Sequence, residues 1–411
     1  MKVVLTYRVL QHWRAPVFRR LAESSEIDFI ALHSRGFPGT PVVNGRDLSG
    51  FRHRELPTLR PLSWLPGSLE TPIPFCPTLP LHLVRERPDV ILAEGSSNLF
   101  NNLAVFAYAR LTRTPVVWWT LGEIRSDQPL SGARRLFRWL GTALERRAAA
   151  LLGYSSRALA YFARQGYPAE RQFRAVNCVD TDRTREQIEK VAERVAPLRR
   201  ELGLEDRRVL LFVGALAVSK RVEDLIAAYA RLRERHPDLA LLIVGEGAHR
   251  PALEAAAARL GLGARDVVFT GEVVDDVAAY FQLGDVFVLP GLGGLAISEA
   301  MVHGLPVLAS EADGCEVDLV EEGRNGYLLT PGDRQGLEAR LDELLSAPHR
   351  LDAMKAHSRW IIENRFNIDT YMESVVDALG YALTGRRQTP VPVWEASSPG
   401  PPSPKREQGD E

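Results

Sequence analysis

The feature that most constrains the fold is an alternation of short apolar segments with helical stretches, which occurs twice along the 411 residues. The apolar segments are five to seven residues long, which is typical of strands buried on both faces of a parallel sheet. The first series is KVVLTY (2–7), IDFIALH (27–33), DVILAE (89–94) and PVVWWT (115–120), and the second is RVLLFVG (208–214), LALLIVG (239–245), DVVFTG (266–271), DVFVLP (285–290) and PVLAS (306–310). The pattern predicts an α/β protein with two doubly wound, Rossmann-like domains.

The strands pause between the two series, and this pause predicts the domain borders. Residues 1–180 are expected to form the N-terminal domain and 206–365 the C-terminal domain, joined by a charged linker over 181–205. Residues 366–386 are expected to form a terminal helix that can cross back to the N-terminal domain. Residues 387–411 contain six prolines and are expected to be a disordered tail.

Charge is divided unevenly between the two halves. Residues 1–180 carry a net charge of +10 and residues 181–411 one of −11. A basic half favours an anionic partner, and incidental surface charge is the alternative. The three cysteines form no CxxC or metal-binding spacing, which favours a reducing compartment without disulfides. Neither a signal peptide nor an apolar run of roughly 18 residues is present, so a cytoplasmic location is expected.

Two turns of the second series follow strands directly, where open parallel sheets bind ligands. In VGALAVSK (213–220), Gly214 permits a tight turn and Lys220 can reach a phosphate as a point charge. A solvated lysine at a helix start is the alternative. In VGEGAHR (244–250), the lone GxG pair is weak evidence for a ligand and equally fits a plain tight turn.

A third turn, LPGLGGLAISEAM (289–301), carries the strongest signal. Gly291, Gly293 and Gly294 allow the backbone to approach a ligand closely. A helix that begins near Gly294 would direct its free N–H groups and its positive dipole end at a diphosphate. Glu299 lies one turn into this helix and is suited to accept hydrogen bonds from ribose hydroxyls, with an ordinary surface residue as the alternative.

Several common catalytic motifs are missing from the chain. It has no GxxxxGK[ST] phosphate loop, no HExxH, no GxSxG and no complete GxGxxG. The signals of a P-loop kinase, a zinc protease, a serine hydrolase and an NAD-dependent dehydrogenase are therefore absent.

From Tyr154 to Asp333 the order and spacing of the motifs resemble glycosyltransferase family 4, whose fold is called GT-B. The run includes NCVD (177–180), VGALAVSKRVEDLI, VVFTGEV, GLAISEAMVHGLPVLAS and GRNGYLLTPGD. The N-terminal half is similar more loosely, through EGSSNLFNNLAVFAYARLTRTPVVWWTLGE (94–123), to members that build bacterial surface polysaccharides.

The resemblance implies two domains that face a central cleft and a sugar transfer with retention of anomeric configuration. The C-terminal domain would hold a UDP- or GDP-linked sugar donor, and the N-terminal domain a saccharide or lipid-linked acceptor. No metal, cofactor or nucleic acid is implied. Lys220 would neutralise the departing diphosphate, Glu299 would hold the ribose and Val273 would border the base. The implied donor-binding residues are Gly214, Ala215, Lys220, Arg221, Gly245, Glu246, Val273, Gly291, Gly293, Gly294, Leu295, Ala296 and Glu299.

The chain departs from the family pattern at four places. Gly291 stands where the family often has a glutamate that contacts the sugar, and Ala215 stands where Arg or Lys is usual. Glu123 falls in the region where a histidine is frequent, and it is a candidate catalytic residue with Lys220 and Glu299. An ordinary residue at a helix start is the alternative for Glu123. VLQHWRAPVF (9–18) replaces a glycine-rich loop, so a specialised acceptor side is expected. The two alternatives to a transferase are an inactive nucleotide-sugar-binding protein, which Gly291 and Ala215 suggest, and an epimerase.

A basic helix is predicted within SGARRLFRWLGTALERRAAA (131–150). Leu136, Leu140, Ala143 and Leu144 line one side of it. A basic helix with interspersed aromatic residues can lie on an anionic bilayer, which would place the protein at the inner face of the cell membrane. Packing of the helix on its own sheet, with a solvated arginine face, is the alternative. The predicted membrane contacts are Arg134, Arg135, Arg138 and Trp139.

Overall fold

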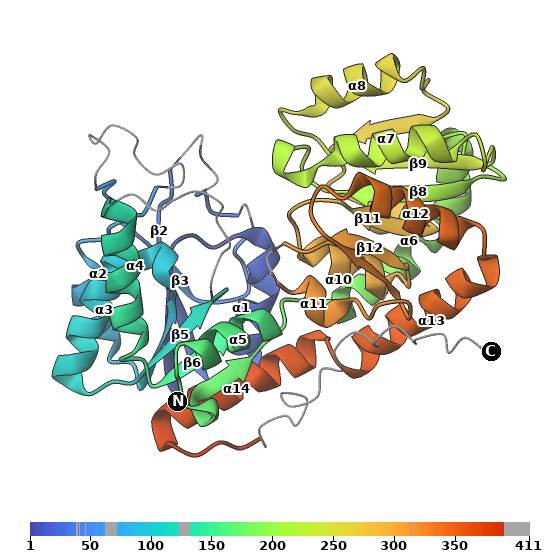
Figure 1. Ribbon diagram of the computed structural model, residues 1–411. Coiled ribbons are helices and arrows are strands. Elements are labelled where there is room, and N and C mark those ends of the chain that lie inside the picture. The colour runs from blue at the N-terminus through green and yellow to red at the C-terminus, as the bar shows by residue number, and fades with distance from the viewer. Residues whose placement is uncertain are drawn as a thin grey trace, which may run out of the picture.

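The computed structural model describes residues 1–37, 40, 42–45, 47–61, 72–122, 132–312 and 314–389. They form two α/β domains that lie side by side, one from each series of strands (Figure 1). Each domain has a fully parallel sheet with helices on both faces, so the predicted fold class is confirmed.

The N-terminal sheet has seven strands in the order β3-β2-β1-β4-β5-β6-β7. Alternate side chains of β1 enter different cores, because Val3 and Leu5 pack on one face of the sheet and Val4 on the other. The order of the strands reverses between β1 and β4, which makes this the switch point of the sheet. The strands are β1 (Lys2–Tyr7), β2 (Asp28–Ser34), β3 (His53–Leu56), β4 (Val90–Glu94), β5 (Val116–Thr120), β6 (Ala150–Gly153) and β7 (Gln172–Arg174).

Helices cover the two faces of this sheet unequally. One face packs against α1 (Ala15–Glu23) and against α14 (Ile368–Thr384), the last helix of the described chain. The other face packs against four helices, which are α2 (Leu79–Glu86), α3 (Leu99–Thr112), α4 (Gly132–Glu145) and α5 (Ser156–Arg164). Short 3₁₀ turns lie at η1 (His12–Arg14), η2 (Ser96–Asn98) and η3 (Ala169–Arg171).

The C-terminal sheet has six strands in the order β10-β9-β8-β11-β12-β13, with its switch point between β8 and β11. The strands are β8 (Arg208–Val213), β9 (Leu239–Val244), β10 (Val267–Gly271), β11 (Val286–Leu289), β12 (Val307–Ser310) and β13 (Gly326–Leu329). The 3₁₀ turn η4 spans Val218–Lys220. The helices are α6 (Thr181–Glu201), α7 (Val222–Leu232), α8 (Arg250–Arg259), α9 (Val277–Phe281), α10 (Leu295–Val302), α11 (Glu316–Leu319), α12 (Arg334–Leu345) and α13 (Pro348–Asn364).

The segment 181–205, which the sequence predicts as a linker, is helical as α6 over most of its length. Asp180 caps this helix by accepting a hydrogen bond from the Arg183 N–H. Val191 and Leu198 lie two turns apart on α6 and pack into the core of the C-terminal domain. Most of the predicted linker is therefore a helix that packs on the C-terminal domain.

Helix α14 brings the chain back to the N-terminal domain. Asn367 begins it with a capping box, and Gly385, at a φ of 66°, ends it. Tyr371 and Val375 pack into the N-terminal core. The Thr389 hydroxyl donates a hydrogen bond to Asp377 of α14, so the first residues of the predicted tail are held against this helix. The rest of that tail, residues 390–411, lies outside the described residues.

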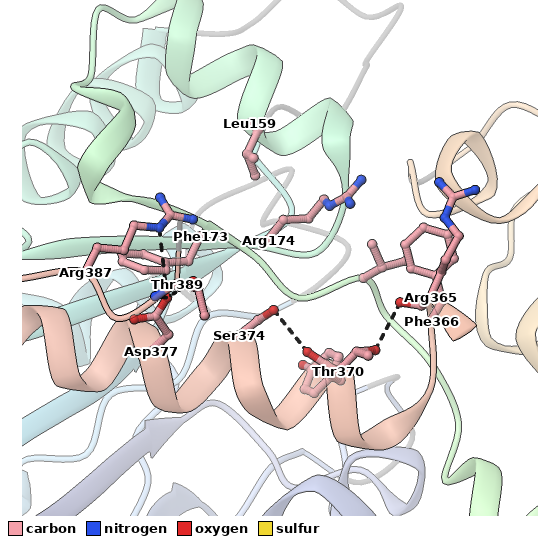
Figure 2. A pocket seen from close by; sticks show the side chains of 12 residues that line it. Leu159, Phe173, Arg174, Arg365, Phe366, Thr370, Ser374, Asp377, Arg387 and Thr389 are labelled. Carbon is pink, nitrogen blue, oxygen red and sulfur yellow. Dashed lines mark hydrogen bonds and ion pairs between the residues drawn. The ribbon is translucent and has the colours of Figure 1, made fainter. Parts of the chain in front are cut away.

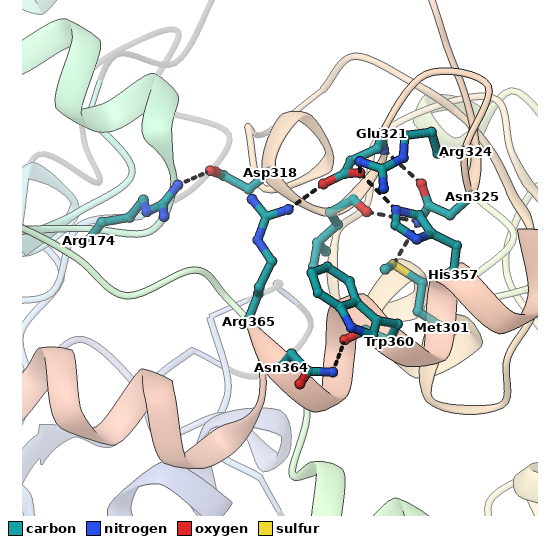
Figure 3. Close-up of polar contacts among 11 residues, drawn as sticks. Arg174, Met301, Asp318, Glu321, Arg324, Asn325, His357, Trp360, Asn364 and Arg365 are labelled. Atoms are coloured by element: carbon teal, nitrogen blue, oxygen red, sulfur yellow. Dashed lines mark hydrogen bonds and ion pairs between the residues drawn. The ribbon is translucent and has the colours of Figure 1, made fainter. Parts of the chain in front are cut away.

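Polar contacts join the two domains beside α5 and α11. Asp318 of α11 accepts a hydrogen bond of 2.7 Å from the N–H of Ser156, at the start of α5, and one of 2.5 Å from Arg174 (Figure 3). A carboxylate at a helix N-terminus is favoured by the helix dipole. Arg157 donates to Glu311 at 2.7 Å in the same region. Part of the positive charge of the N-terminal half is thus matched by acidic residues of the C-terminal half.

Candidate functional site

The turns after the C-terminal strands lie at one edge of the sheet, because all six strands are parallel. The turn after β8 and the turn after β11 adjoin each other at the switch point. The N–H of Leu292 donates to the Ser219 carbonyl at 2.9 Å and links the two turns directly. The structure therefore brings Lys220 and the glycines of residues 291–294 together, as a diphosphate site requires.

The turns after β8 and β9 pack backbone against backbone. A Cβ on Gly245 would lie 2.0 Å from the Gly214 carbonyl oxygen, and one on Gly247 would lie 2.3 Å from the Leu216 carbonyl oxygen. Only glycine fits such an approach, so the GxG pair supports the turn after β8. The Glu246 side chain is exposed and binds Arg250 at 2.6 Å, and this hydrogen bond lowers the pKa of Glu246.

Gly291 is also fixed by close contact with its surroundings. A Cβ at this position would lie 2.3 Å from the Ser219 carbonyl oxygen and 2.5 Å from the Lys220 carbonyl carbon. Contacts this short with backbone atoms leave no room for any side chain. The turn after β8 is therefore packed so closely against residue 291 that the glutamate often found here in the family would not fit.

Lys220 is the last residue of η4, and its side chain reaches the start of α10. Its Nζ is 3.0 Å from the position that a Cβ on Gly293 would occupy. Gly294 is the N-cap of α10, and no side chain caps this helix. The N–H groups of Leu295 and Ala296, in the first turn, have no partner within the helix. An ammonium group and an uncapped helix N-terminus thus meet at one place, which is suited to bind an anion.

Glu299 lies one turn further along α10, and its side chain is 16% exposed. The Thr184 hydroxyl of α6 donates to both carboxylate oxygens, at 3.3 Å and 3.4 Å. His303 Nε2 lies 3.8 Å from Glu299 Oε1. The carboxylate is therefore held from α6 and from the end of its own helix, while part of it faces outward.

Not all of the predicted donor-binding residues are directed at this anion site. Arg221, at a φ of 54°, donates a hydrogen bond of 2.7 Å to the buried Asp224 and lies beside Gly332. Ala215 is exposed in the turn after β8. Val273, after β10, is half-buried against the C-terminal core. Glu123 lies outside the described residues.

At the switch point of the N-terminal sheet, side chains make the polar contacts between the strand ends. Glu94, buried at the end of β4, accepts hydrogen bonds from the N–H of Arg8 and, at 2.8 Å, from the Ser97 hydroxyl. Arg8 Nε lies 3.8 Å from Glu94 Oε1. Neither residue is predicted as a site residue from the sequence. The only signal for them is a charged residue at the end of an apolar strand next to the switch point.

Arg14 anchors the segment 9–18, which replaces the glycine-rich loop of the family. This buried guanidinium donates to the Tyr371 hydroxyl at 3.1 Å. It also lies over the rings of Trp119 and Tyr154, at 4.9 Å and 4.3 Å from their centroids. The neighbouring Trp13 is 41% exposed, so this loop presents an aromatic surface beside the switch point.

The predicted basic helix is α4, which packs beside α3 on the outer side of the N-terminal domain (Figure 1). Leu140 and Leu144 face the core as expected, but Leu136 is 55% exposed and Trp139 is 65% exposed. Arg135 and Arg138 are exposed as well, and the side chain of Arg134 lies outside the described residues. We call the exposed apolar side chains of α2, α3 and α4 the outer apolar surface, namely Leu81, Val84, Leu103, Leu111, Leu136 and Trp139.

A cavity of about 130 Å³ lies elsewhere, between α14 and the edge strand β7 (Figure 2). Arg174, Arg365 and Arg387 line it. Each of these three arginines lies near a carboxylate. The pairs are Arg174 with Asp318 and Arg365 with Glu321, both shown in Figure 3, and Arg387 with Asp377, at 3.9 Å. The cavity is lined by none of the predicted donor-binding residues.

Comparison with known proteins gives consistent matches along the chain. The family model "Glycosyl transferase 4-like domain" matches residues 17–178, and the model "Glycosyl transferases group 1" matches residues 207–347. The 2-deoxystreptamine glucosyltransferase of Streptomyces kanamyceticus is 32% identical over 80% of this chain and 88% of its own length. The GDP-mannose-dependent alpha-(1-6)-phosphatidylinositol monomannoside mannosyltransferase of Mycolicibacterium smegmatis is 34% identical, over 41% of this chain and about half (47%) of its own length.

Solved structures show the same architecture. The Anabaena protein HepE, crystallised with UDP, superposes with a TM-score of 0.72 at 20% identity, over 92% of this chain and all of that one. This likeness confirms the GT-B arrangement of two Rossmann-like domains. Together with the family models and the full-length relative, it shows that the chain belongs to the glycosyltransferases of the group 1, family 4 type.

Proposed function

We propose that this protein transfers a sugar from a UDP- or GDP-linked donor, with retention of anomeric configuration, to a saccharide or lipid-linked saccharide acceptor. The observation that carries the proposal is the position of Lys220 Nζ, 3.0 Å from the Cβ position of Gly293, at the uncapped start of α10. A diphosphate bound there would meet a positive charge and free N–H groups together.

In the proposed reaction the bond between the sugar and the diphosphate breaks and negative charge accumulates on the departing phosphate. A new bond forms between the same sugar carbon and a hydroxyl oxygen of the acceptor, and the proton of that hydroxyl passes to the departing phosphate. Lys220 and the first N–H groups of α10 are in place before this charge develops, so they lower the barrier as well as bind the donor. Glu299, one turn further along, accepts hydrogen bonds from the ribose. Neither a metal ion nor a cofactor enters the proposed reaction.

The acceptor is assigned to the switch point of the N-terminal sheet. Glu94 and Arg8 offer a carboxylate and a cation at the ends of β4 and β1, where ligands bind in sheets of this type. Trp13 adds an exposed aromatic ring that can pack on the apolar face of a sugar. Polar side chains beside an aromatic surface suit a saccharide with many hydroxyl groups.

The names of the relatives support sugar transfer but differ in the molecules they state. One is a 2-deoxystreptamine glucosyltransferase, another acts on a phosphatidylinositol monomannoside, and HepE was solved with UDP-glucose as well as with UDP. Gly291 removes the side chain with which the family often contacts the sugar. Neither the sugar nor the base is therefore assigned.

Incubation of the purified protein with a panel of UDP- and GDP-sugars and saccharide acceptors tests the proposal. Nucleotide release that depends on the acceptor, with a product of unchanged anomeric configuration by NMR, is the expected result. An altered sugar without transfer would indicate an epimerase. Donor binding without turnover would indicate an inactive binding protein, the alternative that Ala215 and Gly291 favour.

We also propose that the outer apolar surface and the arginines of α4 contact an anionic membrane. Exposed Leu136 and Trp139 beside Arg135 and Arg138 combine apolar burial with electrostatic attraction. Within the described residues, no helix has both the length and the apolar character required to cross a membrane. Sedimentation with liposomes that contain anionic lipid should retain the wild type and release an Arg134/Arg135/Arg138→Ala variant, and equal sedimentation of the two would contradict this assignment.

A further inference from the structure

His303 lies immediately after α10, one helical turn beyond Glu299. Its side chain is completely buried and stacks on the ring of Phe281, with 4.9 Å between the centroids and 19° between the planes. A histidine enclosed in this way has a fixed ring orientation, so the direction of each ring nitrogen is set by the fold.

The hydrogen bond to one ring nitrogen determines which nitrogen carries the proton. Gln282 Nε2 lies 2.8 Å from His303 Nδ1. An amide nitrogen only donates, so Nδ1 accepts this hydrogen bond and the neutral ring carries its proton on Nε2. His303 is therefore a donor on the side that faces Glu299.

This donor is unsatisfied in the structure as it stands. Nε2 is buried and has no hydrogen-bond partner among the described residues. Glu299 Oε1 lies 3.8 Å away, about 1 Å beyond hydrogen-bond distance. The hydrogen bonds from Thr184 to the same carboxylate are long, at 3.3 Å and 3.4 Å. A buried donor without a partner is unfavourable, and a small rotation of the carboxylate would provide one.

We infer that His303 is a positioning residue for Glu299 and that it completes its hydrogen bond when the donor binds; this rests on the proposed role of Glu299 at the ribose. The Nε2–H of His303 and the hydroxyl of Thr184 then hold the inner lone pairs of the carboxylate. Its outward lone pairs are directed at the two ribose hydroxyls. A carboxylate that is already oriented loses less conformational freedom on binding, so His303 contributes to donor affinity.

The test compares two replacements of the histidine. His303→Phe keeps the aromatic stacking on Phe281 and removes the donor, whereas His303→Gln offers an amide N–H in its place. Titration calorimetry with UDP and with GDP measures the effect. We expect His303→Phe to weaken binding of the preferred nucleotide by about five- to tenfold, which is in the range for the loss of one ordinary hydrogen bond. His303→Gln should recover most of that loss, and in turnover assays His303→Phe should raise KM more than it lowers kcat.

A double-mutant cycle separates positioning from a general loss of structure. In a Glu299→Ala background, His303→Phe should change nucleotide affinity by less than about twofold, because no carboxylate is left to orient. An equal loss in both backgrounds would overturn the inference, and so would an unchanged affinity of the single variant. The matched control is His236→Phe, which alters another buried histidine, 2.8 Å from Asp342, and should leave nucleotide affinity unchanged.

The outcomes also distinguish this inference from the proposed function. A wild type that binds UDP or GDP without transferring sugar, but still shows the His303 and Glu299 coupling, would overturn the transfer and support the positioning role. A wild type that binds neither nucleotide would overturn both.

Discussion

The two sheets have the same kind of switch point, but the turns at the two switch points are built differently. At the C-terminal switch point and in the adjoining turn after β9, Gly291, Gly245 and Gly247 allow backbone to pack on backbone, and a single lysine provides the charge. At the N-terminal switch point, Glu94 and Arg8 provide the contacts through their side chains.

This difference matches what each domain is proposed to bind. A nucleoside diphosphate has a constant shape and charge, which backbone N–H groups and a helix N-terminus can meet without specific side chains. An acceptor sugar is distinguished by the arrangement of its hydroxyl groups, and hydrogen-bonding side chains provide that specificity. Variation on the N-terminal side would therefore change the acceptor and leave the donor chemistry intact.

The largest expected effect comes from the charged groups of the C-terminal switch point. Lys220→Ala and Glu299→Ala should each lower turnover by about two orders of magnitude or more, because positioned charge and hydrogen bonds are lost. Acceptor-dependent nucleotide release measures the rate, with Lys190→Ala, an exposed lysine of α6, as the control. Near-normal rates in both variants would show that the donor site lies elsewhere.

A second change tests whether the backbone packing matters. Gly291→Ala, and more strongly Gly291→Glu, would bring a Cβ to 2.3 Å from the Ser219 carbonyl oxygen and displace the turn that carries Lys220. We expect a loss of about 1–3 kcal/mol in the free energy of unfolding, as for other overpacked sites, together with weaker nucleotide binding. Chemical denaturation and calorimetry measure both quantities. Gly263→Ala, whose nearest neighbour would lie at 3.8 Å, is the control. Sugar transfer improved by Gly291→Glu would contradict the steric explanation.

A change at the N-terminal switch point should affect the acceptor and leave nucleotide binding unchanged. Glu94→Gln keeps the shape of the side chain but removes its charge and replaces one carboxylate oxygen by an amide nitrogen. This nitrogen cannot accept, so one of the two hydrogen bonds that Glu94 accepts from Arg8 and Ser97 is lost. Acceptor-dependent turnover should fall by about tenfold while nucleotide affinity stays constant, as expected for one charge-assisted hydrogen bond. Glu55→Gln, at an exposed carboxylate of β3, is the control. A loss of nucleotide affinity instead would place Glu94 on the donor side.

Much of the fold could be predicted from the sequence, because buried parallel strands are short apolar runs that alternate with helices. The glycine turns and Lys220 were also predictable, since they follow strands directly. The sequence does not show why residue 291 must be glycine, because a Cβ there would contact Ser219 and Lys220, about 70 positions earlier in the chain. Glu94 and Arg8 contact each other across 86 positions, and His303 reads as an ordinary helix end until its partners are known. The segment 181–205 was predicted as a linker because its charges mask the two apolar residues that bury α6.

The smallest expected effect concerns stability at acid pH, and it compares two carboxylates, one in each domain, whose pKa values are shifted in opposite directions. The hydrogen bond from Arg340 lowers the pKa of Glu343, in the C-terminal domain, to about 2. Burial raises the pKa of Glu145 in the N-terminal domain. A lowered carboxyl pKa stabilises the fold above the unfolded value of about 4.5, and this contribution is lost as the pH falls towards 2. A raised carboxyl pKa has the opposite effect, stabilising at low pH and fading as the pH rises.

Urea denaturation between pH 5 and pH 2.5 measures this difference. Glu343→Gln should reduce the loss of stability on acidification, and Glu145→Gln should increase it, because the stabilisation that protonated Glu145 gives at low pH is removed. The same change in both variants would contradict the opposite signs of the two pKa shifts.

The account depends above all on the separation of donor and acceptor between the two switch points. Calorimetric titration of UDP and GDP onto the wild type, Lys220→Ala and Glu94→Gln tests this separation most directly. We expect Lys220→Ala to weaken binding of the preferred nucleotide by at least about tenfold, as for the loss of a charge-assisted contact, and Glu94→Gln to bind like the wild type. Unchanged binding by Lys220→Ala, or binding lost in Glu94→Gln, would contradict the account.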